Sequence, residues 1–177
     1  LKNILLDYKI ENQKDMDKLI VFCSDKQINN VQKILTTNHI TPQHRFTNVQ
    51  KAIKRKAEKE SEREKILRNF STGEYKALVA IKCLDEGVDV PAAENAIIMS
   101  STSNPREHVQ RRGRILRHSP GKERAVIYDI LVFPEEQMDI GKNILRKEIK
   151  RYREFALNAE NADECLRLLR KYYRMGD

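Results

Sequence analysis

The sequence predicts an α/β fold in which helices cover both faces of a parallel sheet, followed by a helical extension. Four short apolar segments have the length of strands that are buried on both faces, namely residues 19–22, 77–81, 96–99 and 125–132. Helical or loop-forming segments separate these runs, as expected for a parallel sheet. After Pro134 the pattern becomes wholly helical. We therefore expect a sheet domain over residues 1–134 and a helical extension over residues 135–177.

Two helices are predicted around the first strand. Residues 1–16 are expected to form a short amphipathic lead-in helix, whose apolar positions are Ile4, Leu5, Tyr8 and Ile10. Ser24 and Asp25 follow the first strand and are candidate N-caps, because their short polar side chains accept hydrogen bonds from free backbone amides. Apolar residues then recur at helical spacing from Ile28 to Leu35.

A loop and a short strand over residues 39–47 precede a long charged segment. Residues 49–70 are predicted to form one helix that carries many lysines, arginines and glutamates. One interpretation is a solvated helix held by ion pairs between residues four apart. The other is a basic rail for a phosphate backbone, formed by residues 51–59.

Three further helices are predicted in the second half of the chain. The first covers residues 105–116 and has Pro105 in its first turn, where a missing amide proton does no harm. The others cover residues 140–158 and 162–174, and we expect them to pack on the domain edge or to begin a following domain. No apolar run approaches membrane-spanning length, so we expect no membrane partner and a cytoplasmic location.

Composition narrows the function classes. The 177 residues include 34 lysines and arginines against 26 aspartates and glutamates, a formal net charge of +8. This balance suits a polyanionic partner such as nucleic acid, but a merely soluble basic protein fits it equally well. Cys23, Cys83 and Cys165 are far apart and form no CxxC pair, which argues against a disulfide framework or a zinc site. No metal site is expected.

Arginines are concentrated in residues 110–117, which read Gln-Arg-Arg-Gly-Arg-Ile-Leu-Arg. On a helix, Gln110, Gly113, Arg114 and Arg117 share one face through spacings of three and four. That face offers two guanidinium groups, an amide and a glycine that permits close approach. Planar guanidinium suits a phosphate whose charge is spread over several oxygens. Arginine-rich surface helices are also common, so this segment alone leaves a purely structural role open.

A second candidate segment follows the strand at residues 77–81. Residues 85–91 read Asp-Glu-Gly-Val-Asp-Val-Pro, and ligands of open parallel sheets sit beyond the carboxyl ends of strands. Gly87 permits a tight turn, and the carboxylate of Asp89 can accept hydrogen bonds from ribose hydroxyls. An ordinary turn with solvated acids is the alternative.

Together these segments resemble the C-terminal helicase domain of superfamily 2, which is the second RecA-like domain of such motors. Residues 86–91 are similar to the family's motif V, and residues 110–117 to its motif VI. Residues 19–24 resemble motif IV, and residues 63–73 resemble the stretch that the family writes as R…F..G. The resemblance covers roughly residues 16–132. It implies a RecA-like parallel sheet for the first domain.

Two more segments narrow the branch. Residues 80–87 and 103–107 resemble DEAD/DEAH-box helicases of the bacterial restriction-system and XPB-like kinds. Gln110 differs from the histidine that usually opens motif VI in DEAD-box RNA helicases. The resemblance therefore implies DNA as the partner, with duplex favoured over single strands, while RNA stays an alternative.

The resemblance also implies roles for single residues. Arg114 and Arg117 match the arginine fingers that meet the γ-phosphate of ATP held by the partner domain. Gln110 matches a residue near the nucleotide and its attacking water. Arg111 matches a residue that links the two motor domains, and we also expect it to contribute to nucleotide binding.

Motif V and the loops that follow two strands supply the remaining roles that the resemblance implies. Gly87 and Asp89 match the nucleotide-contacting pair of motif V, with Asp89 near the ribose. A nucleic-acid grip is expected at Lys82, and at Ser101 and Thr102 in the loop before motif VI.

The chain contains no GxxxxGK[ST] phosphate loop, and no DExH or DExD motif follows a strand. The sequence begins Leu1-Lys2-Asn3, without an initiator methionine, so we expect a fragment of a longer polypeptide. We expect an upstream RecA-like domain in that polypeptide to be the main holder of ATP and Mg²⁺. The predicted function is the second motor domain of an ATP-dependent DNA helicase or translocase, inactive as an ATPase without that upstream domain. The alternatives are an RNA helicase domain and a degenerate, non-catalytic module that only binds nucleic acid.

Overall fold

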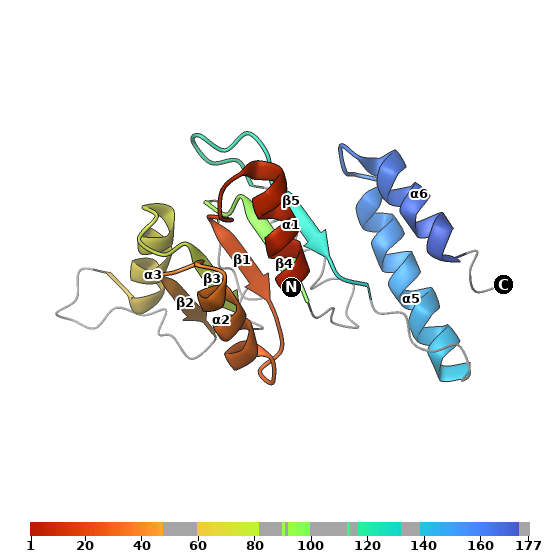
Figure 1. Cartoon of the computed structure of the whole chain (residues 1–177), viewed down its shortest axis with the longest axis horizontal. Coiled ribbons are helices and arrows are strands. Elements are labelled where there is room, and N and C mark those ends of the chain that lie inside the picture. Colours follow the sequence, from red (N-terminus) through yellow and green to blue (C-terminus); the bar gives the residue numbers. More distant parts are fainter. Residues whose placement is uncertain are drawn as a thin grey trace. The chain divides into compact units, whose positions relative to one another are not determined.

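The computed structural model of the chain describes residues 1–47, 60–81, 90, 92–99, 113, 117–131 and 139–173. Two compact units are present, Leu1–Tyr128 and Asp129–Asp177. The first contains nearly all of the sheet, and the second contains two helices (Figure 1). Compact units are not by themselves independently folding domains, so the predicted boundary at residue 134 stays a prediction.

Five short strands form one sheet in the order β2-β3-β1-β4-β5. Their bounds are β1 Leu19–Phe22, β2 Gln43–Phe46, β3 Ala77–Ala80, β4 Asn95–Ile98 and β5 Val126–Asp129. β1 pairs in parallel with β3 on one side and with β4 on the other, and β2 pairs in parallel with β3. The parallel sheet and its predicted strands are therefore confirmed, with the observed strands equal to or shorter than the predicted runs.

The register of the central strands places apolar rows on both faces of the sheet. Ile20 of β1 aligns with Leu78 of β3, and Val21 aligns with Val79. Successive side chains of a strand point to opposite faces, yet all four residues are buried. Both faces of the sheet must therefore be covered.

Helices provide this cover. The helices of the first unit are α1 Lys2–Asn12, α2 Ile28–Thr37 and α3 Glu62–Ser71 (Figure 1). α3 contributes Ile66 and Phe70 to the core cluster that contains Ile20 and Leu78. The buried residues of α2 lie outside this cluster although α2 contacts β3, which places α2 on the opposite face. The predicted arrangement, with helices on both faces, is confirmed.

Two details of the first helices were predicted wrongly. α1 forms as expected, but Leu5 is buried while Ile10 is 68% exposed. The five residues of separation turn Ile10 by about 140° from Leu5 around the helix. The N-cap of α2 is Gln27 rather than Ser24 or Asp25, because the Ser24 hydroxyl instead donates to Oε1 of Gln27 at 2.9 Å.

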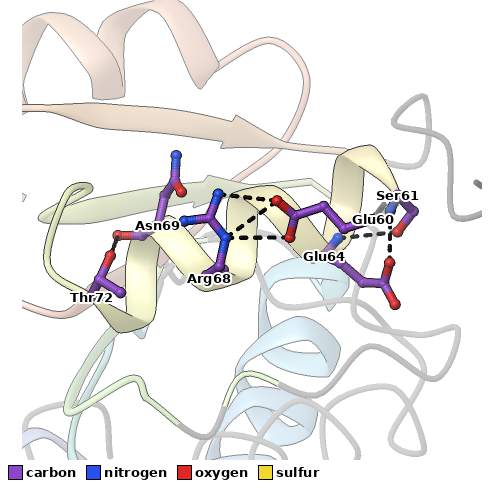
Figure 2. A network of polar contacts seen from close by, with 6 residues as sticks. All are labelled: Glu60, Ser61, Glu64, Arg68, Asn69 and Thr72. Atoms are coloured by element: carbon purple, nitrogen blue, oxygen red, sulfur yellow. Dashed lines mark hydrogen bonds and ion pairs between the residues drawn. The ribbon is translucent and has the colours of Figure 1, made fainter. Parts of the chain in front are cut away.

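The single helix predicted over residues 49–70 is also wrong, because α3 begins only at Glu62. Ser61 has an extended backbone, with φ −75° and ψ 161°, and is the N-cap. Its hydroxyl accepts from the Glu64 amide at 3.2 Å, and the Glu64 carboxylate accepts from the Ser61 amide at 2.7 Å (Figure 2). This reciprocal capping box satisfies two backbone donors that the helix leaves free. Residues 51–59, the predicted rail, lie outside the described residues.

One ion pair of α3 spans this cap. Nη2 of Arg68 lies 3.0 Å from Oε1 of Glu60, and the Arg68 guanidinium also donates to the second carboxylate oxygen (Figure 2). The two residues are eight apart, so the pair ties the helix to the segment before it. The predicted pairing between residues four apart along one helix is not the arrangement at Arg68.

The second unit contains the two helices predicted after Pro134. They are α5 Asp139–Ala156 and α6 Ala162–Tyr173. The two helices contact each other (Figure 1), and Ala156 of α5 and Leu169 of α6 are buried. Arg151 of α5 forms ion pairs with Asp129 at 2.6 Å and with Glu148 at 2.9 Å. The helical extension is therefore confirmed.

Candidate nucleotide and nucleic-acid site

The two arginine- and carboxylate-bearing segments leave the sheet at the same edge. β3 leads into residues 82–89, and β4 leads into residues 100–112. Both strands run parallel to β1 and flank it. Neighbouring strands lie about 4.8 Å apart, so the two segments depart from points roughly 10 Å apart. The segments whose sequences contain motifs V and VI therefore follow strands that lie on either side of β1.

Backbone hydrogen bonds fix this edge up to the last strand residues. The amide of Cys23 donates to the Ala80 carbonyl at 3.1 Å, and the amide of Met99 donates to the Phe22 carbonyl at 2.9 Å. The ladder therefore continues one residue past β1 and β4. The residues that follow are held on a rigid base, which precise ligand geometry requires.

This edge also contains a topological switch point, where the connections from two adjacent strands go to opposite sides of the sheet. From β1 the chain continues to β2 on one side, and from β4 it continues to β5 on the other side. Adjacent parallel strands with diverging connections leave a crevice beyond their carboxyl ends, where open α/β sheets bind ligands. By this general rule, a ligand site is expected beyond the ends of β1 and β4.

The end of β1 itself carries no reactive group. Burial, with a smaller contribution from Asp25, raises the pKa of the Cys23 thiol to about 11. The thiol is therefore protonated at neutral pH and does not act as a nucleophile. The amide and hydroxyl of Ser24 both donate to Oε1 of Gln27, at 3.0 and 2.9 Å. The candidate site residues are therefore those predicted in the segments after β3 and β4.

The structure describes two residues of the predicted arginine-rich face. Gly113 is helical and exposed, as expected, and a Cβ added to it would meet nothing within 4 Å. Packing within the described chain therefore does not require this glycine. Arg117 is exposed, and its carbonyl accepts a hydrogen bond from Nζ of Lys122 at 3.2 Å. The other predicted site residues lie outside the described residues: Lys82, Gly87, Asp89, Ser101, Thr102, Gln110, Arg111 and Arg114.

Lys122 contacts a predicted site residue, and the sequence reasoning missed this contact. Lys122 is nearly buried, with 8% of the residue exposed, and its ammonium group donates to the Arg117 carbonyl. The lysine lies in a turn in which Gly121 has φ +80° and the Lys122 amide donates to the Ser119 carbonyl at 3.0 Å. A lysine after a Pro-Gly pair is normally solvated, so no signal in the sequence indicated this contact.

The described residues contain no group of three histidine, cysteine, aspartate or glutamate side chains that could hold a metal ion. No helix there is long and apolar enough to cross a membrane.

Two curated proteins and one solved structure place the chain among known relatives. The chain is 40% identical over 117 residues to the DNA 3'-5' translocase XPB2 of Sulfurisphaera tokodaii, covering 66% of this chain and 22% of that protein. It is 28% identical over 165 residues to the UvrABC system protein B of Aster yellows witches'-broom phytoplasma, covering 85% of this chain and 24% of that protein. The chain thus spans about a quarter or less of these relatives.

The solved structure supports the fold. The C-terminal part of the Fun30 ATPase domain superposes with a TM-score of 0.56 at 14% identity, covering 95% of this chain and 52% of that one. The model of the helicase conserved C-terminal domain matches residues 1–119, a range that includes residues 86–91 and 110–117. This chain belongs to the helicase conserved C-terminal domain family of superfamily 2.

Proposed function

We propose that this chain is the second motor domain of an ATP-dependent DNA helicase or translocase. The observation that supports the proposal is that β3 and β4, the strands that precede the motif V and motif VI segments in sequence, lie parallel to β1 on either side of it. A nucleotide bound at that edge would face the carboxylates of one segment and the arginines of the other. The open surface beside Gly113 leaves room for a ligand to approach that helix.

In this proposal, Arg114 and Arg117 supply charge to the γ-phosphate of ATP bound between this domain and an upstream one. A guanidinium group placed at that point stabilises the charge of the transition state, and such a finger accelerates hydrolysis by about 10³–10⁵-fold. Gln110 and Arg111 act beside the nucleotide, and Asp89 acts at its ribose. Lys122 keeps the backbone at Arg117 in place through its hydrogen bond to that carbonyl.

The proposal assigns phosphate and metal binding to the upstream domain. The described residues offer no cluster of metal ligands, and the sequence contains no phosphate loop. When bound, Mg²⁺ would neutralise phosphate charge. This chain alone is therefore expected to bind ATP poorly and not to hydrolyse it.

DNA is proposed as the track because of charge and of the named relatives. The formal net charge of +8 favours a polyanion. The relative at 40% identity is named as a DNA translocase. The grip is expected in the segments after β3 and β4, at Lys82, Ser101 and Thr102. Opening and closing of the two domains on ATP would then move these grips along DNA.

The test uses the longer polypeptide that includes the upstream domain. ATP hydrolysis is measured without nucleic acid and with single-stranded DNA, duplex DNA or RNA. We expect strong stimulation by DNA, and a fall in kcat of about 10³-fold in Arg114→Ala with DNA affinity nearly unchanged. Arg167→Ala, which removes an exposed arginine of α6, is the matched control and should behave as the unaltered protein.

Other outcomes point to the alternatives. Normal hydrolysis by Arg114→Ala would refute the arginine-finger role. Stimulation by RNA alone would identify an RNA motor. Hydrolysis under no condition, together with salt-dependent DNA binding, would identify a non-catalytic binding module.

A further inference from the structure

One face of α5 is cationic and fully in solvent. The exposed described residues of this helix are Asn143, Arg146, Lys147, Lys150, Arg153 and Glu154. At about 100° per residue they occupy an arc of roughly 120°. Four of the six are cations, and we call Arg146, Lys147, Lys150 and Arg153 the α5 basic stripe. The opposite side, which includes Tyr152 and Ala156, is half-buried or buried.

Within the described part of the chain, the α5 basic stripe has no carboxylate partners. Among the described residues, none of its four side chains has a carboxylate oxygen within 4.0 Å. Glu154 lies four residues after Lys150, but the pair does not meet that distance. On the inner side of the same helix, Arg151 is bound to both Asp129 and Glu148. Asp129 and Glu148 thus neutralise the half-buried Arg151, and neither of them pairs with the stripe.

We infer that the α5 basic stripe binds the phosphate backbone of duplex DNA. In choosing DNA as the polyanion we rely on the proposed function, and the stripe would add a second grip to it, separate from the segments after β3 and β4. Arg146 and Arg153 are seven residues apart, which is about 10 Å along the helix. Duplex DNA carries a charge for about every 1.7 Å of its axis, so several phosphates lie within that length.

Such contacts have a defined physical signature. They release counterions and carry no base readout, so binding should be independent of sequence and should weaken steeply with salt. Each phosphate contact adds about 0.9 to the slope of log affinity against log salt. Four contacts would therefore contribute a slope of about 3–4.

The experiment compares two variants of the whole chain that lose the same charge. The stripe variant replaces Arg146, Lys147, Lys150 and Arg153 by glutamine, which is a good helix former. The control variant carries Lys2→Gln, Lys14→Gln, Lys33→Gln and Lys65→Gln, which alter exposed residues of the first unit. Each variant removes four charges from the formal +8. Far-UV circular dichroism checks that both retain the helical content of the unaltered chain.

Binding to a fluorescent DNA duplex, and to an RNA duplex of the same sequence, is titrated at several salt concentrations without ATP. We expect the stripe variant to bind DNA at least tenfold more weakly at about 0.1 M salt. The steepness of its plot of log affinity against log salt concentration should fall by about 3–4. The control variant should lose much less of both. A stripe variant that has lost its helix is replaced by the pairs Arg146→Gln/Lys150→Gln and Lys147→Gln/Arg153→Gln, each expected to lose about half of that slope.

Equal losses in the stripe and control variants would show that net charge alone matters, and would overturn the inference. A loss confined to RNA would overturn it too, because the partner would then be RNA. The assay needs no ATP, so a stripe effect can stand even if the hydrolysis test of the proposed function fails. Conversely, DNA-stimulated hydrolysis with no stripe effect would reject the stripe and keep the proposed function.

Discussion

The ion network inside the second unit can be tested by replacing Arg151 with methionine. Nη1 of Arg151 donates to both Asp129 oxygens, at 2.9 and 2.6 Å, and Nη2 donates to Glu148 at 2.9 Å. The Asp129 side chain is only 2% exposed, and that of Arg151 is 10% exposed. Methionine has a similar apolar stem but no charge. The substitution therefore leaves the Asp129 carboxylate buried without its cation.

The expected cost follows from this burial. Removing one partner of a buried ion pair typically costs about 3–5 kcal/mol, because the remaining charge is neither paired nor hydrated. Replacing both partners by apolar residues is often neutral. We therefore expect Arg151→Met to destabilise α5 by about 3–5 kcal/mol, and the double variant Asp129→Leu/Arg151→Met to recover most of that loss. Glu148, whose side chain is 16% exposed, keeps some access to water.

The loss should also depend on pH. Burial raises the pKa of Asp129 above its ordinary 3.8, and Arg151 offsets this only in part. A carboxyl with a raised pKa contributes stability that is full below its unfolded-state pKa and is lost as the pH rises through its folded-state pKa. Arg151→Met removes the offset, so that pKa rises further. The destabilisation should therefore be smaller at about pH 5 than at about pH 8.

Amide hydrogen exchange measured by mass spectrometry reports the local stability of α5 in these variants. Protection of α5 should fall by a hundred- to several-thousandfold at the higher pH, since each 1.4 kcal/mol is about tenfold. Peptides from β1 serve as the internal control. The reasoning is refuted if α5 protection is unchanged, if the loss is equal at both pH values, or if the double variant is no better than the single one.

Two further predictions concern the first unit. Ser61→Ala should lower the free energy of unfolding in urea by about 1 kcal/mol, because the capping box of α3 loses its hydroxyl; Ser71→Ala, at the exposed end of the same helix, should change it little. Cys23, with its pKa raised to about 11 from 9.0, should react with iodoacetamide at about pH 8 roughly a hundredfold more slowly than in the urea-unfolded chain. A folded-state rate equal to the unfolded one would contradict the burial of that thiol.

Strands were easier to predict than helix ends. A run such as Leu19–Phe22 is apolar at every position, and only a strand buried on both faces suits so short a run. The start of a helix depends on which side chain accepts a hydrogen bond from the free backbone amides of the first turn. Ser24 bonds to Gln27 and does not cap α2, while Ser61 does cap α3. Both serines look suitable in sequence, and tertiary contacts decide between them.

The strands that lead into the predicted site could be recognised from the sequence. Parallel pairing brings the carboxyl ends of β3 and β4 to one edge, so the order of strands and motifs already implied that both motif segments follow strands of this edge. The roles of the residues in those segments stay predictions. Of the predicted site residues, Arg117 has a described contact, through its carbonyl to Lys122. That contact was not predictable, because a lysine after a turn is normally solvated and here is buried.

Charge content alone does not distinguish a solvated helix from a binding helix, and α3 and α5 show why. Both are rich in charged residues, but Arg68 of α3 is bound by Glu60, so that guanidinium is already neutralised within the chain. In the second unit, the carboxylates of Asp129 and Glu148 pair with Arg151 on the inner side of α5. Among the described residues, the cations on the outer side of α5 have no carboxylate within 4.0 Å, so they can interact with another molecule. A polyanion that neutralised them would release counterions without breaking any described ion pair of this chain. The pairing of each charge, more than the number of charges, is thus what makes α5 the stronger candidate for contact with DNA.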